Sequence, residues 1–589
     1  MQHPPHKVFT QVANAQDAKR LEKAKVACRT ALRAKPYDVG CMNALGLIES
    51  QLGNSAAAKQ WFKKALGFHP QNAEILSHYG FSLIEEGNYD EAVVALRQAV
   101  AFASHPIEAV YHLGLALYET GQREEAAAVY QQALNAKPDY VEALNGLGNI
   151  LFDQGKAQEA IACFQRAVAI RPDYVMAYNN MGLAFARLGT WEDADKAYSQ
   201  AIAVKPDYPE AYNNLGVACA LRGRSEESIA CYQKALALRP AYSEAHNNLG
   251  NALKECGRME EAIAQYEKAL RKKGSADYRH NLALAHLATG QFDLGWRGYE
   301  ARWETQALAP SRRNFAQPQW KGEEATGRRI LVHAEQGFGD TLQFCRYAPL
   351  LKARGMTVIL EVPPALVKLM GSLEGVDQVI ATGRDLPDFD WHCPMMSLPL
   401  ACGTTLDTIP AKTPYLTADE GAVAAWRERL PEAKGAVRIG LVWEGNARTQ
   451  TEDLAAANRR RSMAPDLLAP LIGETGAQFY SLQKFGAPAP AAFRLIDVMA
   501  ECDDFAATAA LIANLDLIIS VDTAVVHLAG AMGKPVWVLN RFSGCWRWLR
   551  EREDSPWYPS LRLFRQTAPD DWAGVVERVR EALAQQKRG

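Results

Sequence analysis

The chain has 589 residues, which exceeds the size of a single hydrophobic core and predicts several domains. Its 65 Lys and Arg residues nearly balance its 67 Asp and Glu residues, so no net charge favours binding to nucleic acid or to an acidic membrane surface. The 11 cysteines form no C-x-x-C pair, which favours reduced thiols over a zinc site or disulfides and predicts a cytoplasmic location.

The N-terminal segment, Met1 to Thr10, is polar and lacks the apolar stretch of a signal peptide. No window approaches the run of about 20 apolar residues that crosses a bilayer. We therefore expect no integral membrane segment.

The first half of the chain is an internal repeat. Glycines recur every 34 residues, which is the tetratricopeptide period, at Gly46, Gly80, Gly114, Gly148, Gly182, Gly216 and Gly250. A small residue, then an aromatic or large apolar residue and usually a proline follow each glycine in the same phase. This pattern predicts paired antiparallel helices stacked into an α-solenoid over residues 1–303, ending in a capping helix with an atypical outer face.

Asparagines share the repeat phase and are expected on the concave face of the solenoid. A ladder of their amides can clamp the backbone of an extended polypeptide. The alternative is that the asparagines are consensus residues that satisfy neighbouring backbone turns. The candidate acceptor-binding residues are Asn145, Asn179, Asn180, Asn213, Asn214, Asn247 and Asn248.

The repeat ends near Trp303, and residues 304–328 are polar and irregular, as expected of a linker. Apolar strands then alternate with helical segments, which predicts an α/β domain over 329–417 and a second over 418–589. One helix is expected from Thr341 to Arg354. Two consecutive Rossmann-like domains leave a crevice at the carboxyl ends of their strands, where ligands bind.

The first candidate constellation is a glycine turn that contains Gly337, Gly339 and Asp340. Glycine backbone permits close approach of a ligand, and a carboxylate at a helix start can accept a proton from a hydroxyl group. The alternative for Asp340 is a helix N-cap. The turn is no dinucleotide fingerprint, since Leu342 replaces the last glycine.

The second constellation is a strand that runs into a helix at Asp522, Thr523 and Ala524, followed by His527. The free N–H groups of a helix start form a phosphate site. The alternative is helix capping by Asp522 or Thr523, with His527 buried as a structural residue.

Two further segments are candidates for binding a sugar nucleotide. Arg459, Arg460 and Arg461 are expected on a loop, where they could neutralise a leaving phosphate. As an isolated run of charge they would instead be solvated surface. Gln483 and Lys484 follow an expected strand and could meet a base or ribose.

Taken in order, E-Q-G-F-G-D-T-L-Q-F-C-R-Y, G-L-V-W-E-G-N, R-R-R-S, Y-S-L-Q-K, D-T-A-V-V-H-L-A-G-A-M-G-K-P-V-W-V-L and W-R-W-L-R-E-R-E-D-S-P-W-Y-P-S-L-R-L-F-R-Q resemble bacterial tetratricopeptide-repeat glycosyltransferases. The second half is similar to the heptosyltransferases, and the whole layout is similar to that of the O-linked N-acetylglucosamine transferases. The resemblance implies a tetratricopeptide superhelix followed by a GT-B fold of two Rossmann-like domains.

The resemblance also implies residue roles. Asp340 matches the proposed general base of the heptosyltransferases, and Asp522, Thr523 and His527 match the D-T-x-x-x-H segment that holds the donor diphosphate. Arg460 or Arg461 lies near the position of a phosphate-contacting lysine. The loop E-G-N-A-R-T-Q departs from the A-G-N-P of relatives, which leaves the donor sugar open.

The function expected from the resemblance is transfer of a sugar from a nucleotide-activated donor to Ser or Thr of a protein held by the repeats. Some such enzymes modify flagellin in the cytosol with nonulosonic acids such as pseudaminic acid. No D-x-D directly follows the carboxyl end of an expected strand of the catalytic half, so no metal and no other cofactor is expected. The alternatives are a glycan or lipopolysaccharide transferase and a scaffold with an inactive transferase half.

Overall fold

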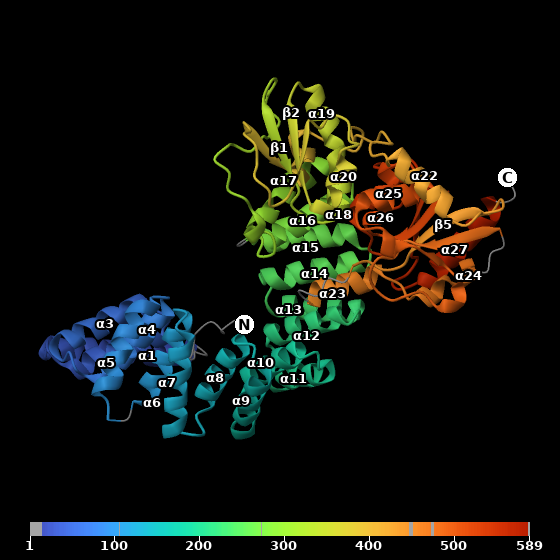
Figure 1. The fold of residues 1–589 in the computed structure, drawn as a ribbon. Coiled ribbons are helices and arrows are strands. Elements are labelled where there is room, and N and C mark those ends of the chain that lie inside the picture. Colours follow the sequence, from blue (N-terminus) through green and yellow to red (C-terminus); the bar gives the residue numbers. More distant parts are fainter. Residues whose placement is uncertain (1–14, 105, 272–273, 447–451, 473–475, 587–589) are drawn as a thin grey trace. The chain divides into compact units, whose positions relative to one another are not determined.

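The computed structural model describes residues 15–104, 106–271, 274–446, 452–472 and 476–586. Two compact units are distinguished within them, one extending to Ala218 and the other beginning at Cys219 (Figure 1). None of the described helices combines the length and the apolar character needed to cross a bilayer.

The first unit is a series of antiparallel helix pairs, as the repeat predicts. Its helices are α1 (Ala15–Ala34), α2 (Val39–Gln51), α3 (Ser55–Phe68), α4 (Ala73–Glu85), α5 (Tyr89–Phe102), α6 (Ile107–Glu119), α7 (Arg123–Ala136), α8 (Val141–Asp153), α9 (Ala157–Ile170), α10 (Val175–Arg187), α11 (Trp191–Val204) and α12 (Pro209–Leu221), the last of which runs into the second unit.

The periodic glycines allow the two helices of a pair to pack closely. A Cβ atom placed on Gly148 would lie 2.5 Å from the ring of Phe164, and one on Gly182 would lie 2.5 Å from Tyr198. Each aromatic ring therefore occupies the space that a side chain at the glycine would need. This contact explains why glycine and aromatic residue recur together in the sequence.

The second unit begins with the remaining helices of the array. These are α13 (Ser225–Leu238), α14 (Ser243–Glu255), α15 (Met259–Leu270), α16 (Ala276–Ala288) and α17 (Phe292–Tyr299). The outer face of α17 is covered, because Trp296 meets Phe344 and Trp546 edge-on and Phe292 stacks on Trp557. The array ends at this helix, whose outer face, expected to be atypical, packs on aromatic residues of the α/β region.

The first α/β sheet is four-stranded and parallel, with the order β3-β2-β1-β4. Ile330 and Leu331 are neighbours in its first strand and point to opposite faces, and both are fully buried, so the sheet is covered on both faces, as is usual for parallel sheets. The strands are β1 (Arg329–His333), β2 (Thr357–Val362), β3 (Gln378–Ala381) and β4 (Trp391–Pro394).

The second sheet is six-stranded and parallel, with the order β10-β9-β8-β5-β6-β7, which is the Rossmann order. Val575 and Val579 of α27 (Trp572–Gln586) pack in one core with Ile439 and Ile519 of its central strands. The strands are β5 (Val437–Val442), β6 (Ala477–Ser481), β7 (Ile496–Asp497), β8 (Leu517–Val521), β9 (Val536–Asn540) and β10 (Leu561–Arg565). The predicted solenoid followed by a GT-B type α/β region is thereby confirmed.

Two local expectations differ from the structure. The single helix expected from Thr341 to Arg354 is instead α18 (Phe338–Phe344), a 3-10 turn and α19 (Ala348–Ala353). Pro349, which lacks an amide hydrogen, stands in the first turn of α19 and restarts the helix there. The three arginines expected on a loop form the last turn of α23 (Glu452–Arg461).

The remaining helices of the α/β region are short and connect or flank the strands. They are α20 (Val367–Met370), α21 (Leu398–Ala401), α22 (Glu420–Arg429), α24 (Ala469–Ile472), α25 (Phe505–Ala513) and α26 (Ala524–Ala531).

Candidate active site

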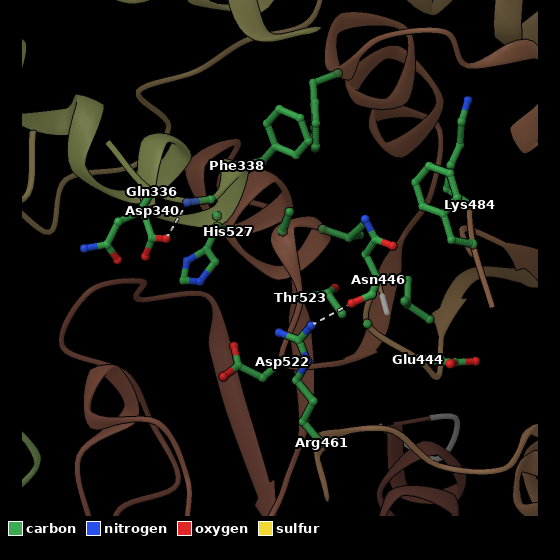
Figure 2. Close-up of a pocket in the computed structure, with 18 of the residues that line it drawn as sticks. Gln336, Phe338, Asp340, Glu444, Asn446, Arg461, Lys484, Asp522, Thr523 and His527 are labelled. Carbon is green, nitrogen blue, oxygen red and sulfur yellow. Dashed lines mark hydrogen bonds between the residues drawn. The ribbon is translucent and has the colours of Figure 1, made fainter. Parts of the chain in front are cut away.

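A cleft of about 1050 Å³ lies at the carboxyl ends of both parallel sheets in the second unit. Its walls come from the turns that follow the strands of both sheets and from α16 and α17 of the array. The sequence-predicted residues that line it are Gly337, Gly339, Asp340, Arg461, Gln483, Lys484, Asp522, Thr523, Ala524 and His527. Figure 2 labels six of them, namely Asp340, Arg461, Lys484, Asp522, Thr523 and His527.

Asp340 lies in the first turn of α18, in the turn that follows β1. One carboxylate oxygen accepts a hydrogen bond of 3.0 Å from the Gly337 amide, and Gly337 itself occupies the N-cap position. The other carboxylate oxygen is paired with the guanidinium of Arg547. Asp340 therefore contributes to helix capping and also lines the cleft, with 20% of its side chain exposed.

Arg547 also lines the cleft, although it is not among the residues predicted from the sequence. Its Nε donates to Gln343 at 2.8 Å, and its guanidinium lies 4.4 Å from the centre of the Trp546 ring. Burial alone would lower the pKa of Arg547, but the charge of Asp340 reverses this, so the pKa is raised and the group stays cationic. The available signal was an arginine flanked by tryptophans in W-R-W.

Thr523 is the N-cap of α26 and has extended backbone, with φ of −136°. Its side chain makes no capping bond to the helix and instead lies 3.0 Å from the hydroxyl of Ser520. Ala524 and Val525, in the first turn of α26, line the cleft, and the Thr523 side chain does not cap the amides of this turn. Such a helix start, between the loops of a parallel sheet, suits an anionic group.

His527 packs behind this helix start and beneath the glycine turn. Its Nδ1 lies 3.0 Å from the Tyr558 hydroxyl, and its ring stacks on Trp548. A Cβ atom on Gly339 would lie 2.9 Å from the His527 ring, so only glycine permits this approach between α18 and α26. Burial, with the charges of Arg547 and Arg346, holds the pKa of His527 well below its usual value, and the ring is neutral at pH 7.

The two candidate arginines at the end of α23 differ in position. Arg461 lines the cleft, bonds the Asn458 side chain through Nε at 2.9 Å and approaches the Asn446 carbonyl at 3.3 Å (Figure 2). Arg460 does not line the cleft and instead lies 3.6 Å from the carboxylate of Glu255 on the repeat array. The residues Ala447 to Gln450 of the divergent loop lie outside the described part of the chain.

Gln483 uses its side chain to shape the loop beside it. Its carbonyl oxygen accepts from the amides of Trp443 and Glu444, each at 3.1 Å, and its amide donates to the Glu444 carbonyl at 2.9 Å. Lys484 donates from Nζ to the carbonyl oxygens of Met499 and Cys502. Both residues border the cleft, and these hydrogen bonds hold the loops beside it.

The candidate asparagines lie on the helices of the array and outside the cleft. Asn180 donates at 3.0 Å to both Asn145 and Asn149, and Asn214 donates to Asn179 at 2.9 Å. These amides are largely buried and connect neighbouring repeats. The structure therefore gives these asparagines a structural role, which is to connect neighbouring repeats. Their binding to an acceptor polypeptide remains a prediction.

Comparison with family models matches both halves of the chain. Residues 39–72 match a tetratricopeptide repeat, residues 94–294 match the C-terminal domain of cilia and flagella-associated protein 70, and residues 496–541 match glycosyltransferase family 9, the heptosyltransferases. The last match covers the segment that contains the start of α26. The chain therefore joins tetratricopeptide repeats to a glycosyltransferase-like region.

The chain is similar to protein FlbA of Caulobacter vibrioides (strain ATCC 19089 / CIP 103742 / CB 15). The two are 27% identical over 329 residues, which cover 50% of this chain and 53% of FlbA. The chain thus spans about half the length of this curated relative.

The solved structures similar to the chain include MamA, at 28% identity and a TM-score of 0.25, covering 27% of this chain and 94% of MamA. A tetratricopeptide repeat protein from Parabacteroides merdae ATCC 43184 has 17% identity and a TM-score of 0.37, with 42% of this chain and 98% of that protein covered.

Proposed function

We propose that the chain is a protein O-glycosyltransferase. It transfers a sugar from a nucleotide-activated donor to a Ser or Thr hydroxyl of a polypeptide recruited by the repeats, with flagellin as the acceptor and a nonulosonic acid such as pseudaminic acid as a candidate sugar. The observation that carries the proposal is one cleft lined both by the carboxylate of Asp340 and by the amide-rich start of α26.

In the proposed reaction the acceptor hydroxyl oxygen attacks the anomeric carbon of the donor. The bond from that carbon to the phosphate oxygen breaks, the bonding electrons leave with the phosphate, and the hydroxyl proton passes to Asp340. The Gly337 amide and Arg547 hold the carboxylate in place for this step. Donor and acceptor held together in one cleft supply the favourable orientation.

The charge that develops on the leaving phosphate needs preorganised donors. In this proposal the first-turn amides of α26 and the guanidinium of Arg461 provide them, since both border the cleft. Such groups stabilise a transition state without reorganising during the reaction, and no metal ion is required for the step.

The match to glycosyltransferase family 9 and the buried polar core of the cleft favour a working transferase over an inactive scaffold. The repeats favour a polypeptide over a glycan acceptor, because solenoids commonly bind polypeptides along their concave face.

The proposal is tested by incubating the purified full chain with a panel of sugar nucleotides and either flagellin or lipopolysaccharide. A mass increase of one sugar on flagellin alone supports protein glycosylation. Transfer to lipopolysaccharide alone would favour the glycan enzyme, and absence of binding to every sugar nucleotide would favour the scaffold.

A further inference from the structure

Residues in and beside the turn between α14 and α15 of the repeat array contact one segment of the six-stranded α/β domain at two points. Near the start of that segment, the Ser543 hydroxyl donates to the carboxylate of Glu255 at 2.5 Å. Near its end, Arg550 donates at 2.8 Å both to Glu260 and to the carbonyl oxygen of Gly257. The array is thus attached to both ends of residues 541–550, which follow β9.

The same segment forms part of the cleft wall. Arg541, Cys545, Trp546 and Arg547 all line the cleft, and Arg547 holds the carboxylate of Asp340. A contact that fixes this segment therefore fixes groups beside the reacting atoms. Gly257 permits the close fit, because its φ is +76° and a side chain there would lie 3.2 Å from the Phe542 ring.

The Glu255 carboxylate is surrounded by several cationic side chains. Its carboxylate lies 3.6 Å from Nε of Arg460, which comes from the end of α23, beside α14 (Figure 1). Burial tends to raise the pKa of Glu255, but Lys254, Arg541, Arg460 and the Ser543 hydroxyl outweigh it, and the pKa is lowered. Glu255 is consequently ionised at pH 7 and offsets the repulsion among these cations.

Two of these cations have nitrogen atoms in need of an acceptor. Nη1 of Arg541, a residue of the cleft wall, is buried and has no hydrogen-bond partner among the described residues, and Nε of Arg460 has the ion-pair contact with Glu255 but no hydrogen bond there. A buried donor without an acceptor is costly, so a donor of this kind in a cleft wall is suited to an anionic ligand. Phosphate oxygens of a donor nucleotide would supply the acceptors.

We infer that Glu255, on the repeat array, is a positioning residue that holds Arg541 of the cleft wall, and Arg460 next to the cleft residue Arg461, for the phosphate groups of the donor nucleotide. This inference rests on the proposed function. It makes the array part of the donor site, in addition to its role in recruiting an acceptor.

The direction in which Glu255→Gln changes the affinity for phosphate distinguishes a positioning role from mere proximity. If Glu255 merely lies near the donor site, its negative charge repels phosphate, and Glu255→Gln tightens binding. If Glu255 positions the arginines, the neutral amide leaves three cations without their counter-charge. The cations then move apart, and binding of phosphate weakens.

The experiment measures calorimetric binding of UDP, GDP, ADP, CDP, CMP and inorganic pyrophosphate to the full chain, and then of the tightest probe to variants. Glu255→Gln should weaken binding about tenfold, the usual loss for one charge-assisted contact. Glu255→Asp should restore most of the affinity. Ser543→Ala should weaken binding by a smaller factor, and it tests the same contact if Glu255→Gln folds poorly.

The matched control is Glu119→Gln, because Glu119 ends α6 at the same repeat position at which Glu255 ends α14. Its affinity should equal that of the wild type. Unchanged or tighter binding by both Glu255→Gln and Ser543→Ala would overturn the inference while leaving the proposed function intact. If no probe binds the wild type, the proposed donor site and the inference both fail.

Discussion

The guanidinium of Arg547 is paired with the carboxylate of Asp340, although 207 residues separate them in the sequence. Asp340 belongs to the turn after β1 of the first sheet, and Arg547 belongs to the segment after β9 of the second. The ion pair therefore connects the two α/β sheets at the cleft. Any account of Asp340 as a proton acceptor has to include this partner.

Replacing Asp340 by Asn should lower kcat by about 10²–10⁴ through loss of the general base. The Asn side chain keeps an oxygen that can accept from the Gly337 amide, so the start of α18 should persist. We expect the affinity for a donor nucleotide to change little. Steady-state kinetics and calorimetry on the purified variant measure both quantities.

The control for this substitution is Asp390→Asn. Asp390 also accepts from a backbone amide, that of Arg329 at 2.8 Å, but does not line the cleft. Its kcat should match that of the wild type. Equal activity of the Asp340 and Asp390 variants would reduce Asp340 to a helix-capping residue.

Asn180→Ala should destabilise the array by about 1–3 kcal/mol, because it removes the donor that bonds Asn145 and Asn149 and leaves their buried oxygens without it. Thermal unfolding measures this loss. The affinity for a donor nucleotide should not change, since Asn180 lies outside the cleft. A variant with unchanged thermal stability and lost acceptor binding would show that the amides serve the ligand alone.

The sequence predicted the solenoid well because its determinants are local. The contact of Gly148 with Phe164 joins residues of one helix pair and recurs in register along the chain. The asparagines were harder to interpret, since the same repeat phase suits a ligand-facing ladder and bonds between repeats such as Asn180 to Asn145.

The cleft was less predictable because its contacts are distant in sequence. The motifs identified Asp340 and the start of α26, but only the fold pairs Arg547 with Asp340 and Arg460 with Glu255. Similarly, the end of α23 was expected to be a loop because a run of arginines is compatible with both structures.

The second unit should lose stability as the pH falls from about 6.5 towards 4. Burial, with the charges of His392, Arg313 and Arg302, lowers the pKa of His333 to about 3, and burial with Arg302 lowers that of His280 to about 4. Below pH 6.5 these two histidines bind protons in the unfolded chain but stay neutral in the folded chain. Stability is therefore greatest above pH 6.5 and is lost progressively below it.

His333→Gln should flatten this dependence, since His333 is only 3% exposed and its shift corresponds to a few kcal/mol at most. Urea unfolding between pH 7.5 and 4 gives the slope, and the exposed His69→Gln serves as a control. Identical slopes for His333→Gln and the wild type would show that His333 does not contribute.

Transferase activity should be unchanged by EDTA and by added Mg²⁺. The developing phosphate charge is assigned here to the amides of α26 and to Arg461, both at the cleft. Assays with and without chelator on extensively dialysed protein measure the effect. Loss of activity in EDTA that Mg²⁺ restores would contradict this assignment.

The most direct test of the central claim is the intact mass of flagellin from cells that carry the wild-type gene, no gene, or the Asp340→Asn variant. Protein O-glycosylation predicts a glycan mass on flagellin with the wild type and its loss in the other two strains. The same flagellin mass in all three strains would contradict the assignment of flagellin as the acceptor and of Asp340 as the base that modifies it.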